Sequence, residues 1–132
     1  MALGRREFTV AMMASVGGCA LPASRDKSQT GAQHMFGLIG KMIAAPGQRE
    51  ALIAVLLDGT QDMPGCLSYV VARDAKDENA IWISEVWDSK DSHAASLKLP
   101  SVQAAIAKGK PMIAGFGDYV TTEPVGGVGL TV

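Results

Sequence analysis

The 132-residue sequence has few of the side chains that bind metals and no strong charge of either sign. It contains only two cysteines and two histidines; the histidines are far apart, and neither lies at a metal-ligand spacing from Cys66. The formal net charge is −1, whereas nucleic-acid binding needs a concentrated basic surface. We therefore expect no metal site and no nucleic acid partner.

The sequence also lacks a glycine-rich motif of the kind that binds a dinucleotide. That motif opens a helix directly after a strand, but Gly115-x-Gly117 falls inside an expected strand and the glycines at 126–129 fall in a tail. We expect no cofactor. The composition that remains, 48% apolar and 19% charged residues, is typical of a folded domain of one core.

Residues 1–19 predict an export signal, because a charged start, a short apolar run and small residues follow one another in that order. Arg5-Arg6-x-Phe8 resembles a twin-arginine signal, although Gly4 stands where Ser or Thr is usual. Cys19 resembles the cysteine of a lipoprotein signal and is the expected lipidation site. We expect an exported protein, periplasmic or anchored to a membrane by lipid. The alternative is a cytoplasmic protein whose translation begins at Met35.

Residues 20–34 are rich in polar residues and Gly, and they predict a flexible linker. If Cys19 carries lipid, Cys66 has no partner within the chain, so no disulfide is expected. Cys66 is then most simply a small buried apolar side chain.

A regular pattern of apolar residues and turn signals begins at Met35 and predicts one domain over residues 35–124, with a Gly-rich tail at 125–132. Strand-like runs alternate with helix-like stripes. The expected strands are 36–43, 66–73, 80–87 and 112–122, and the expected helices are 48–57, 92–97 and 102–108. Asp88-Ser89 is expected to cap the second helix, and Pro100 to separate it from the third.

This order predicts an α+β fold of the ferredoxin-like, split βαβ type. Helices can cover only one face of the sheet, yet the middle strands carry large apolar residues on both faces. One face is expected to hold Leu67, Tyr69, Val71, Ile81, Ile83 and Trp87, and the other Val70, Trp82 and Val86. A second copy of the chain would cover the second face, so we expect a homodimer whose sheets form a dimeric α/β barrel.

Four segments together resemble the antibiotic biosynthesis monooxygenase family. They are residues 35–41 (MFGLIGK), 63–69 (MPGCLSY), 83–93 (ISEVWDSKDSH) and 111–116 (PMIAGF). The resemblance implies a small cavity between sheet and helices, and oxygen chemistry without flavin, haem or metal on quinols or polycyclic phenols. The function it implies is a cofactor-independent monooxygenase or oxidase that uses molecular oxygen on quinols or related small aromatic phenols. The alternative is a non-catalytic dimeric barrel that binds a small hydrophobic ligand.

His93, Tyr69 and Glu85 are the candidate catalytic residues. His93 follows the third expected strand and has the side chain best suited to proton transfer near neutral pH, unless it is a surface or capping residue. Tyr69 would hold a phenolic oxygen, or it is a core residue. Glu85, if buried, needs a partner, and an Arg such as Arg73 across the dimer is the structural explanation.

Three further residues are expected to contact the substrate: Trp87, Phe36 and Leu97. Trp87 shares a strand face with Glu85 and offers a flat wall for an aromatic ring. Packing in the core or at the dimer interface explains Trp87 nearly as well, because large aromatic residues are common in both.

Overall fold

The computed structural model describes residues 34–130, so the predicted signal, Cys19 and nearly all of the linker lie outside the described residues. The strands and the three α-helices follow the predicted order, although α2 begins two residues earlier than predicted and the short helix η1 was not predicted. They are β1 (Phe36–Ala44), α1 (Arg49–Gly59), β2 (Cys66–Arg73), β3 (Ala80–Trp87), α2 (Lys90–Ser96), α3 (Pro100–Gly109), the short 3₁₀ helix η1 (Lys110–Met112) and β4 (Ile113–Thr122).

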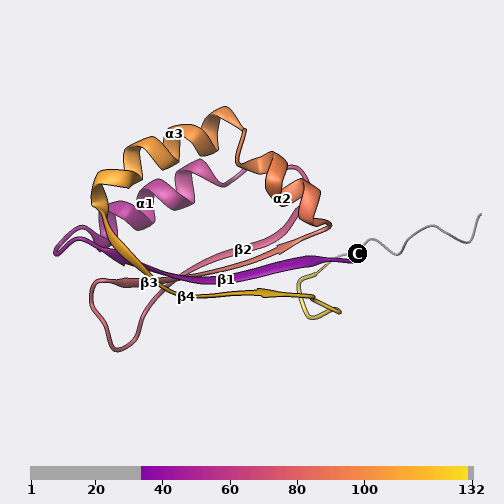
Figure 1. Cartoon of the computed structure of the whole chain (residues 1–132), viewed down its shortest axis with the longest axis horizontal. Coiled ribbons are helices and arrows are strands. Elements are labelled where there is room, and N and C mark those ends of the chain that lie inside the picture. Colours follow the sequence, from indigo (N-terminus) through magenta and orange to yellow (C-terminus); the bar gives the residue numbers. More distant parts are fainter. Residues whose placement is uncertain (1–33, 131–132) are drawn as a thin grey trace, which may run out of the picture.

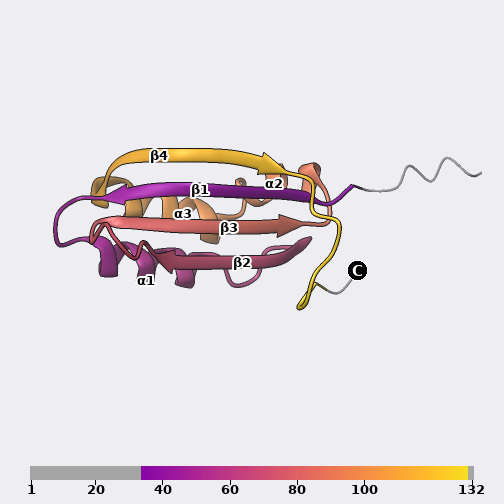
Figure 2. The same ribbon diagram turned by 90° about the horizontal axis from the view of Figure 1, so that it is seen from below.

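The four strands form one antiparallel sheet in the order β2-β3-β1-β4. Helices α1, α2 and α3 lie on one face of this sheet, as Figure 1 shows, and none of the elements described in residues 34–130 covers the other face. Figure 2 shows β4 and β2 at the two edges, with β1 and β3 between them. The predicted ferredoxin-like α+β fold is confirmed.

Helix α1 packs on the sheet through Leu52 and Val55, which are buried. It extends two residues beyond the predicted end at Leu57. The Thr60 hydroxyl donates a hydrogen bond to the Leu56 carbonyl (2.7 Å), and this bond closes the last turn. Gly59 then lies directly against Ala105 of α3, where a larger side chain would collide.

The connection from β3 to α3 follows local rules that the sequence displays. Ser89 caps α2 as predicted, because its Oγ accepts a hydrogen bond from the Ser92 backbone N–H (3.1 Å). Pro100 stands in the first turn of α3. The N–H groups of a first turn have no partner within the helix, so proline, which lacks this N–H, loses no hydrogen bond there. Helix α3 begins at Pro100, three residues after Leu97. The predicted start at Val102 was two residues too late.

A β-bulge at the start of β2 corrects one prediction. Cys66 pairs with Trp87 and Ser68 pairs with Val86, so Leu67 is an extra residue between two rungs of the ladder. Cys66 and Tyr69 consequently both pack toward the helices beside Trp87, whereas Leu67 belongs to neither core cluster. The prediction that Leu67 shares a face with Tyr69 was wrong, because strict alternation fails at a bulge.

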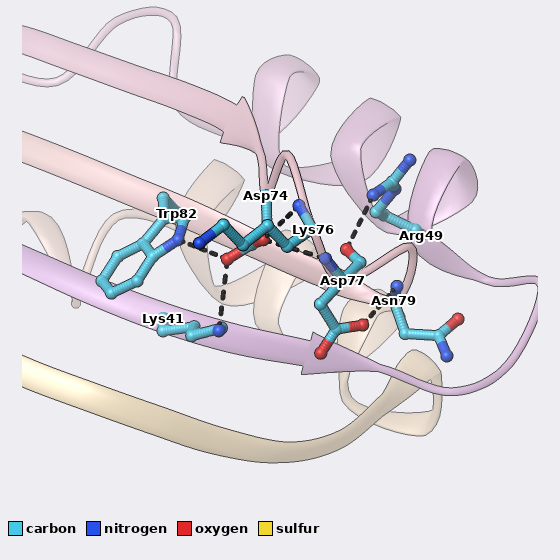
Figure 3. Close-up of polar contacts among 7 residues, drawn as sticks. All are labelled: Lys41, Arg49, Asp74, Lys76, Asp77, Asn79 and Trp82. Carbon is cyan, nitrogen blue, oxygen red and sulfur yellow. Dashed lines mark hydrogen bonds and ion pairs between the residues drawn. The ribbon is translucent and has the colours of Figure 1, made fainter.

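On the face away from the helices, Asp74 organises the hairpin between β2 and β3 (Figure 3). Its carboxylate accepts hydrogen bonds from the Trp82 indole N–H (2.8 Å) and from the backbone N–H groups of Lys76 (2.8 Å) and Asp77 (2.9 Å). The ammonium of Lys41 lies 3.2 Å from the same carboxylate. These donors hold the pKa of Asp74 far below its usual range. The hairpin is thereby fixed on the sheet.

The core has two clusters under the helices. The first contains Ala44, Leu52, Ile81 and Ile83, and the second contains Met63, Trp87 and Val102. The second cluster lies where β3 leads into α2. It therefore fixes the segment that carries His93.

Candidate active site

A cavity of about 660 Å³ lies between the sheet and the helix layer. Most of its walls are apolar side chains from all four strands and all three helices, and they include Met42, Leu56, Ile83 and Val102. Glu85, Tyr69 and His93 interrupt these walls with polar groups. A mostly apolar cavity with a few converging polar groups is typical of a site for a small organic ligand.

His93 is held at the cavity wall by the first turn of α2. Its backbone N–H donates to the carbonyl of Ser89, the capping residue (3.3 Å). The imidazole packs against two aromatic rings, with its centroid 5.1 Å from that of Phe36 and 5.5 Å from that of Trp87, which it meets edge to face. These contacts restrict the ring, so His93 lies in the cavity lining and is not a free surface residue.

Gly65 allows the turn before β2 to touch the start of α2. Its φ of +81° favours glycine, and a Cβ at this position would lie 2.5 Å from the Cβ of Ser92. The carbonyl of Gly65 also accepts a hydrogen bond from the Asp88 N–H (2.9 Å). The sequence Met63-Pro64-Gly65 thus fixes the end of α2 from which His93 projects.

Glu85 is the buried carboxylate of the cavity, with its side chain 12% exposed. Its Oε2 accepts a hydrogen bond from the Trp87 indole N–H (2.8 Å) and lies 3.8 Å from Nε2 of His93. Burial raises the pKa of Glu85, and the Trp87 hydrogen bond and the nearby imidazole oppose this rise. Glu85 therefore supplies a carboxylate directly beside the histidine.

Arg73 is not the partner of Glu85 within the chain. Its guanidinium binds the carboxylate of Glu50 through two hydrogen bonds, from Nε (2.8 Å) and Nη2 (2.6 Å). Arg73 is the last residue of β2 and pairs with Ile81, so it lies at the hairpin end, four residues along the strand from Tyr69, which pairs with Glu85. Arg73 of the same chain is thus engaged with α1, and the expected pair between Glu85 and an arginine across a dimer stays a prediction.

Tyr69 stands opposite Glu85 in the β2–β3 ladder and lines the cavity. Burial, and then the negative charge of Glu85, raise the pKa of its phenol strongly. Tyr69 therefore stays protonated at physiological pH. It can donate a hydrogen bond to an oxygen in the cavity but is not suited to accept a proton.

The structure brings five of the six predicted site residues to one cavity: His93, Tyr69, Glu85, Trp87 and Leu97 all line it. The sixth, Phe36, is absent from the lining and instead supports the His93 ring from behind. Trp87 is only 1% exposed, and its N–H is occupied by Glu85, so it offers a ring surface and no free donor.

Several apolar lining residues were not predicted from the sequence. Ile106 of α3 and Phe116 of β4 are the largest of those that are also exposed to solvent. The only signal for Ile106 was its place on the apolar stripe of its helix, one turn after Val102. The sequence did not indicate that Phe116 lines a cavity, because a single apolar residue in an edge strand can equally be a core residue or a surface residue.

Cys66 packs beside Met63 and Trp87, as expected of a small apolar side chain. Burial raises the pKa of its thiol, which disfavours the reactive thiolate. Within residues 34–130, no group of three or more His, Cys, Asp or Glu side chains is placed to hold a metal ion. No helix in this part of the chain is long and apolar enough to cross a membrane.

The fold and the cavity define a small ferredoxin-like domain with a largely apolar cavity between its sheet and its helices. Residues 35–108 match the model of the antibiotic biosynthesis monooxygenase family, so the match covers more than half of the chain. The chain belongs to this family. The resemblance inferred from the sequence is confirmed, and membership supports a monooxygenase-like function in general terms.

Solved structures agree with this assignment. A candidate antibiotic biosynthesis monooxygenase from Chloroflexus aurantiacus J-10-fl is 65% identical, with a TM-score of 0.72, and the match covers 74% of this chain and 99% of that one. A similarly described protein from Caulobacter crescentus CB15 is 24% identical (TM-score 0.65; 72% and 93% covered), and protein PA3566 from Pseudomonas aeruginosa is 18% identical (TM-score 0.63; 72% and 98% covered). These two show the shared fold. No curated protein sequence matches the chain.

Proposed function

We propose that this protein is a cofactor-independent monooxygenase or oxidase that uses molecular oxygen on quinols or related small aromatic phenols. The observation that carries the proposal is the group of Glu85, His93 and Tyr69 in a mostly apolar cavity. A carboxylate beside a histidine, with a phenol opposite, is suited to remove a proton from a bound hydroxyl and to hold the resulting oxyanion. Membership of a monooxygenase family supports the oxygen chemistry.

In this proposal His93 accepts the phenolic proton of the substrate. The carboxylate of Glu85, 3.8 Å from Nε2, stabilises the imidazolium that forms. Tyr69 remains protonated and donates a hydrogen bond to the phenolate oxygen. Trp87 provides the wall against which the substrate ring packs.

The redox step then belongs to the substrate and oxygen. The phenolate transfers one electron to oxygen, which gives a phenoxyl radical and superoxide. If a second electron follows, a hydroquinone becomes a quinone, and its two electrons and two protons convert oxygen to hydrogen peroxide. If the radical pair instead joins, a carbon–oxygen bond forms, and the proton held by His93 returns to the peroxide anion to give a hydroperoxide. This hydroperoxide loses water and leaves one oxygen atom in the product. The apolar walls keep bulk water from the anion during this step.

Oxygen consumption by the purified, metal-stripped protein with a panel of hydroquinones tests the proposal. We expect at least one hydroquinone to be oxidised faster than in buffer alone, with hydrogen peroxide or an oxygenated product in matching yield. The enzyme proposal fails if the protein accelerates none of them.

The second candidate function is that of a non-catalytic dimeric barrel that binds a small hydrophobic ligand. The apolar walls of the cavity favour it, because they bury a ligand whether or not it reacts. Calorimetric binding of a hydroquinone together with an unchanged rate of oxygen consumption would support this candidate.

We propose further that a second copy of the chain covers the bare face of the sheet and forms a homodimer. Ile39 of β1, Val70 of β2 and Val120 of β4 are exposed at 37%, 52% and 50%. From the ladder register, none of the three shares a face with the core residues of its strand. An apolar sheet face of this kind is unfavourable in water, and a partner related by two-fold symmetry would cover it with the same face of its own sheet.

We also propose that the protein is exported and that lipid on Cys19 holds it at a membrane. Support comes from the motifs of residues 1–19 alone. The linker of residues 20–34 would then separate the domain from the membrane surface.

A further inference from the structure

The lining of the cavity is not uniform in its exposure to solvent. Glu85 and His93 are withdrawn, with side chains 12% and 19% exposed. In contrast, Leu97, Ile106 and Phe116 line the cavity and are also 45%, 48% and 74% exposed. A side chain that meets both the cavity and bulk solvent marks the opening. The opening therefore lies between the end of α2, helix α3 and the edge strand β4.

Large apolar side chains from three separate elements thus surround this opening. Of the remaining exposed lining residues, Ala114 is also apolar, and only Lys110 is charged. Apolar groups gathered at the entrance of a cavity are unfavourable in water, and they become favourable when an apolar ligand covers them.

The volume of the cavity exceeds what a single aromatic ring fills. A cavity of about 150 Å³ holds a benzene molecule, whereas this one measures about 660 Å³. A one-ring hydroquinone would leave most of the apolar wall without contact, and unfilled apolar space weakens binding.

We propose that the ligand is an amphiphile, a phenol or hydroquinone that carries a long alkyl chain. This inference rests on the proposed function for its ring. The hydroxyl lies at Glu85, Tyr69 and His93, and the chain follows the apolar wall and leaves through the opening at Leu97, Ile106 and Phe116. The ring hydroxyl needs the polar groups, whereas most of the remaining lining is apolar and suits an alkyl chain.

Calorimetry with para-alkylphenols tests this arrangement without any need for turnover. The probes are the methyl, butyl and octyl compounds, each used below the concentration at which micelles form. Burial of each added methylene should raise the affinity by about fourfold, until the chain reaches solvent. Phe116→Ser and Ile106→Ser should each reduce the gain in affinity from methyl to octyl by at least about tenfold, because each removes much of the apolar surface in contact with the chain.

Leu57→Ser is the matched control. Leu57 is an apolar helix residue with nearly the same exposure as Ile106, 49% against 48%, but it is not part of the cavity lining. This variant should keep the full gain from methyl to octyl. Because the two rim variants change different elements, a folding defect in one leaves the other as a test.

Equal affinity for the methyl and octyl compounds would overturn the proposal. A loss of the dimer in both rim variants, without a change in the chain-length gain, would assign the rim to contact between copies and would overturn it as well. The outcome for the proposed function is separate. If no hydroquinone is oxidised but the octyl gain is present and depends on Phe116 and Ile106, the catalytic proposal fails and the ligand class stands.

Discussion

The imidazole Nε2 of His93 lies 3.8 Å from Oε2 of Glu85, and the same carboxylate oxygen accepts the indole N–H of Trp87 at 2.8 Å. The carboxylate of Glu85 therefore orients the indole ring of Trp87, which forms part of the cavity wall, and also faces the imidazole of His93. The contact with His93 joins two elements, because α2 carries the histidine and β3 carries the carboxylate, whereas Glu85 and Trp87 stand two residues apart on β3.

The first prediction concerns proton transfer. His93→Ala should lower the turnover of the best hydroquinone by about 10²–10⁴, the usual contribution of a general base. The measurement is the initial rate of oxygen consumption, with circular dichroism to verify the fold. His34→Ala is the control, because His34 is largely exposed and paired with Glu123 (2.5 Å), away from the cavity. Equal rates for His93→Ala and the wild type would remove His93 from the mechanism.

The second prediction concerns the pH dependence of stability. Burial raises the pKa of Glu85 above its ordinary value of 4.5, so the folded state holds this proton more tightly than the unfolded state. The contribution of Glu85 to stability is complete below pH 4.5 and is lost as the pH rises through the folded value. Glu85→Gln keeps an acceptor for Trp87 and cannot ionise. Relative to the wild type, its free energy of unfolding should increase as the pH is raised from acid to neutral.

Glu50→Gln provides a control of opposite sign for that experiment. The hydrogen bond from Arg73 lowers the pKa of Glu50, so its contribution is present above the unfolded value and is lost as the pH falls. Urea unfolding at a series of pH values measures both variants. Parallel pH profiles of Glu85→Gln and the wild type would contradict the burial of a perturbed carboxylate.

The third prediction concerns Gly65. Gly65→Ala should destabilise the fold by more than Gly47→Ala, although both glycines have a positive φ, +81° and +77°. Gly47 has no neighbouring atom within 4 Å of an added Cβ, so its substitution carries only the backbone cost of about 1–2 kcal/mol. At Gly65 the Cβ collides with Ser92, which should add about 1–3 kcal/mol.

Chemical denaturation of the two glycine variants measures this difference. Because the collision lies at the start of α2, Gly65→Ala should also lower hydroquinone oxidation, whereas Gly47→Ala should not. Equal destabilisation of the two variants would show that the contact between the turn and α2 is loose in solution.

The fourth prediction concerns assembly. The protein should have twice the mass of one chain in light scattering at micromolar concentration. Val70→Lys should raise the dimer dissociation constant by at least about tenfold, because it places a charge in a buried apolar contact. Leu57→Lys, an equally exposed apolar position on the helix side, should not. A monomeric wild type would contradict the barrel.

The fifth prediction concerns location in the cell. Replacement of Arg5 and Arg6 by Lys should retain the protein inside if the twin-arginine route carries it, and Cys19→Ala should release it from the membrane if lipid anchors it. Cell fractionation with immunodetection measures both. A native protein found only in the soluble cytoplasm would favour translation from Met35.

The sequence by itself determined the order of the strands and of the three α-helices, and the extent of the two strands in the hairpin. The limits of β2 and β3 are Cys66–Arg73 and Ala80–Trp87, as predicted, because turn residues on either side define them locally. The cap at Ser89 is likewise a local arrangement. His93 could be selected because it is the only histidine of residues 35–124 and suits proton transfer near neutral pH, and Tyr69 and Glu85 because they stand on the neighbouring expected strands.

Only the tertiary structure decided which side chains meet. The bulge at Leu67 shifts Cys66 to the helix face, and the pairing of Arg73 with Glu50 leaves Glu85 to His93 and Trp87. Phe36 proved to support the histidine, while Ile106 and Phe116 surround the opening. Strand register, and the contacts between segments far apart in the sequence, depend on how the whole sheet and its helices pack together. The periodicity of apolar residues along the chain indicates only local structure, not the register or the contacts between distant segments.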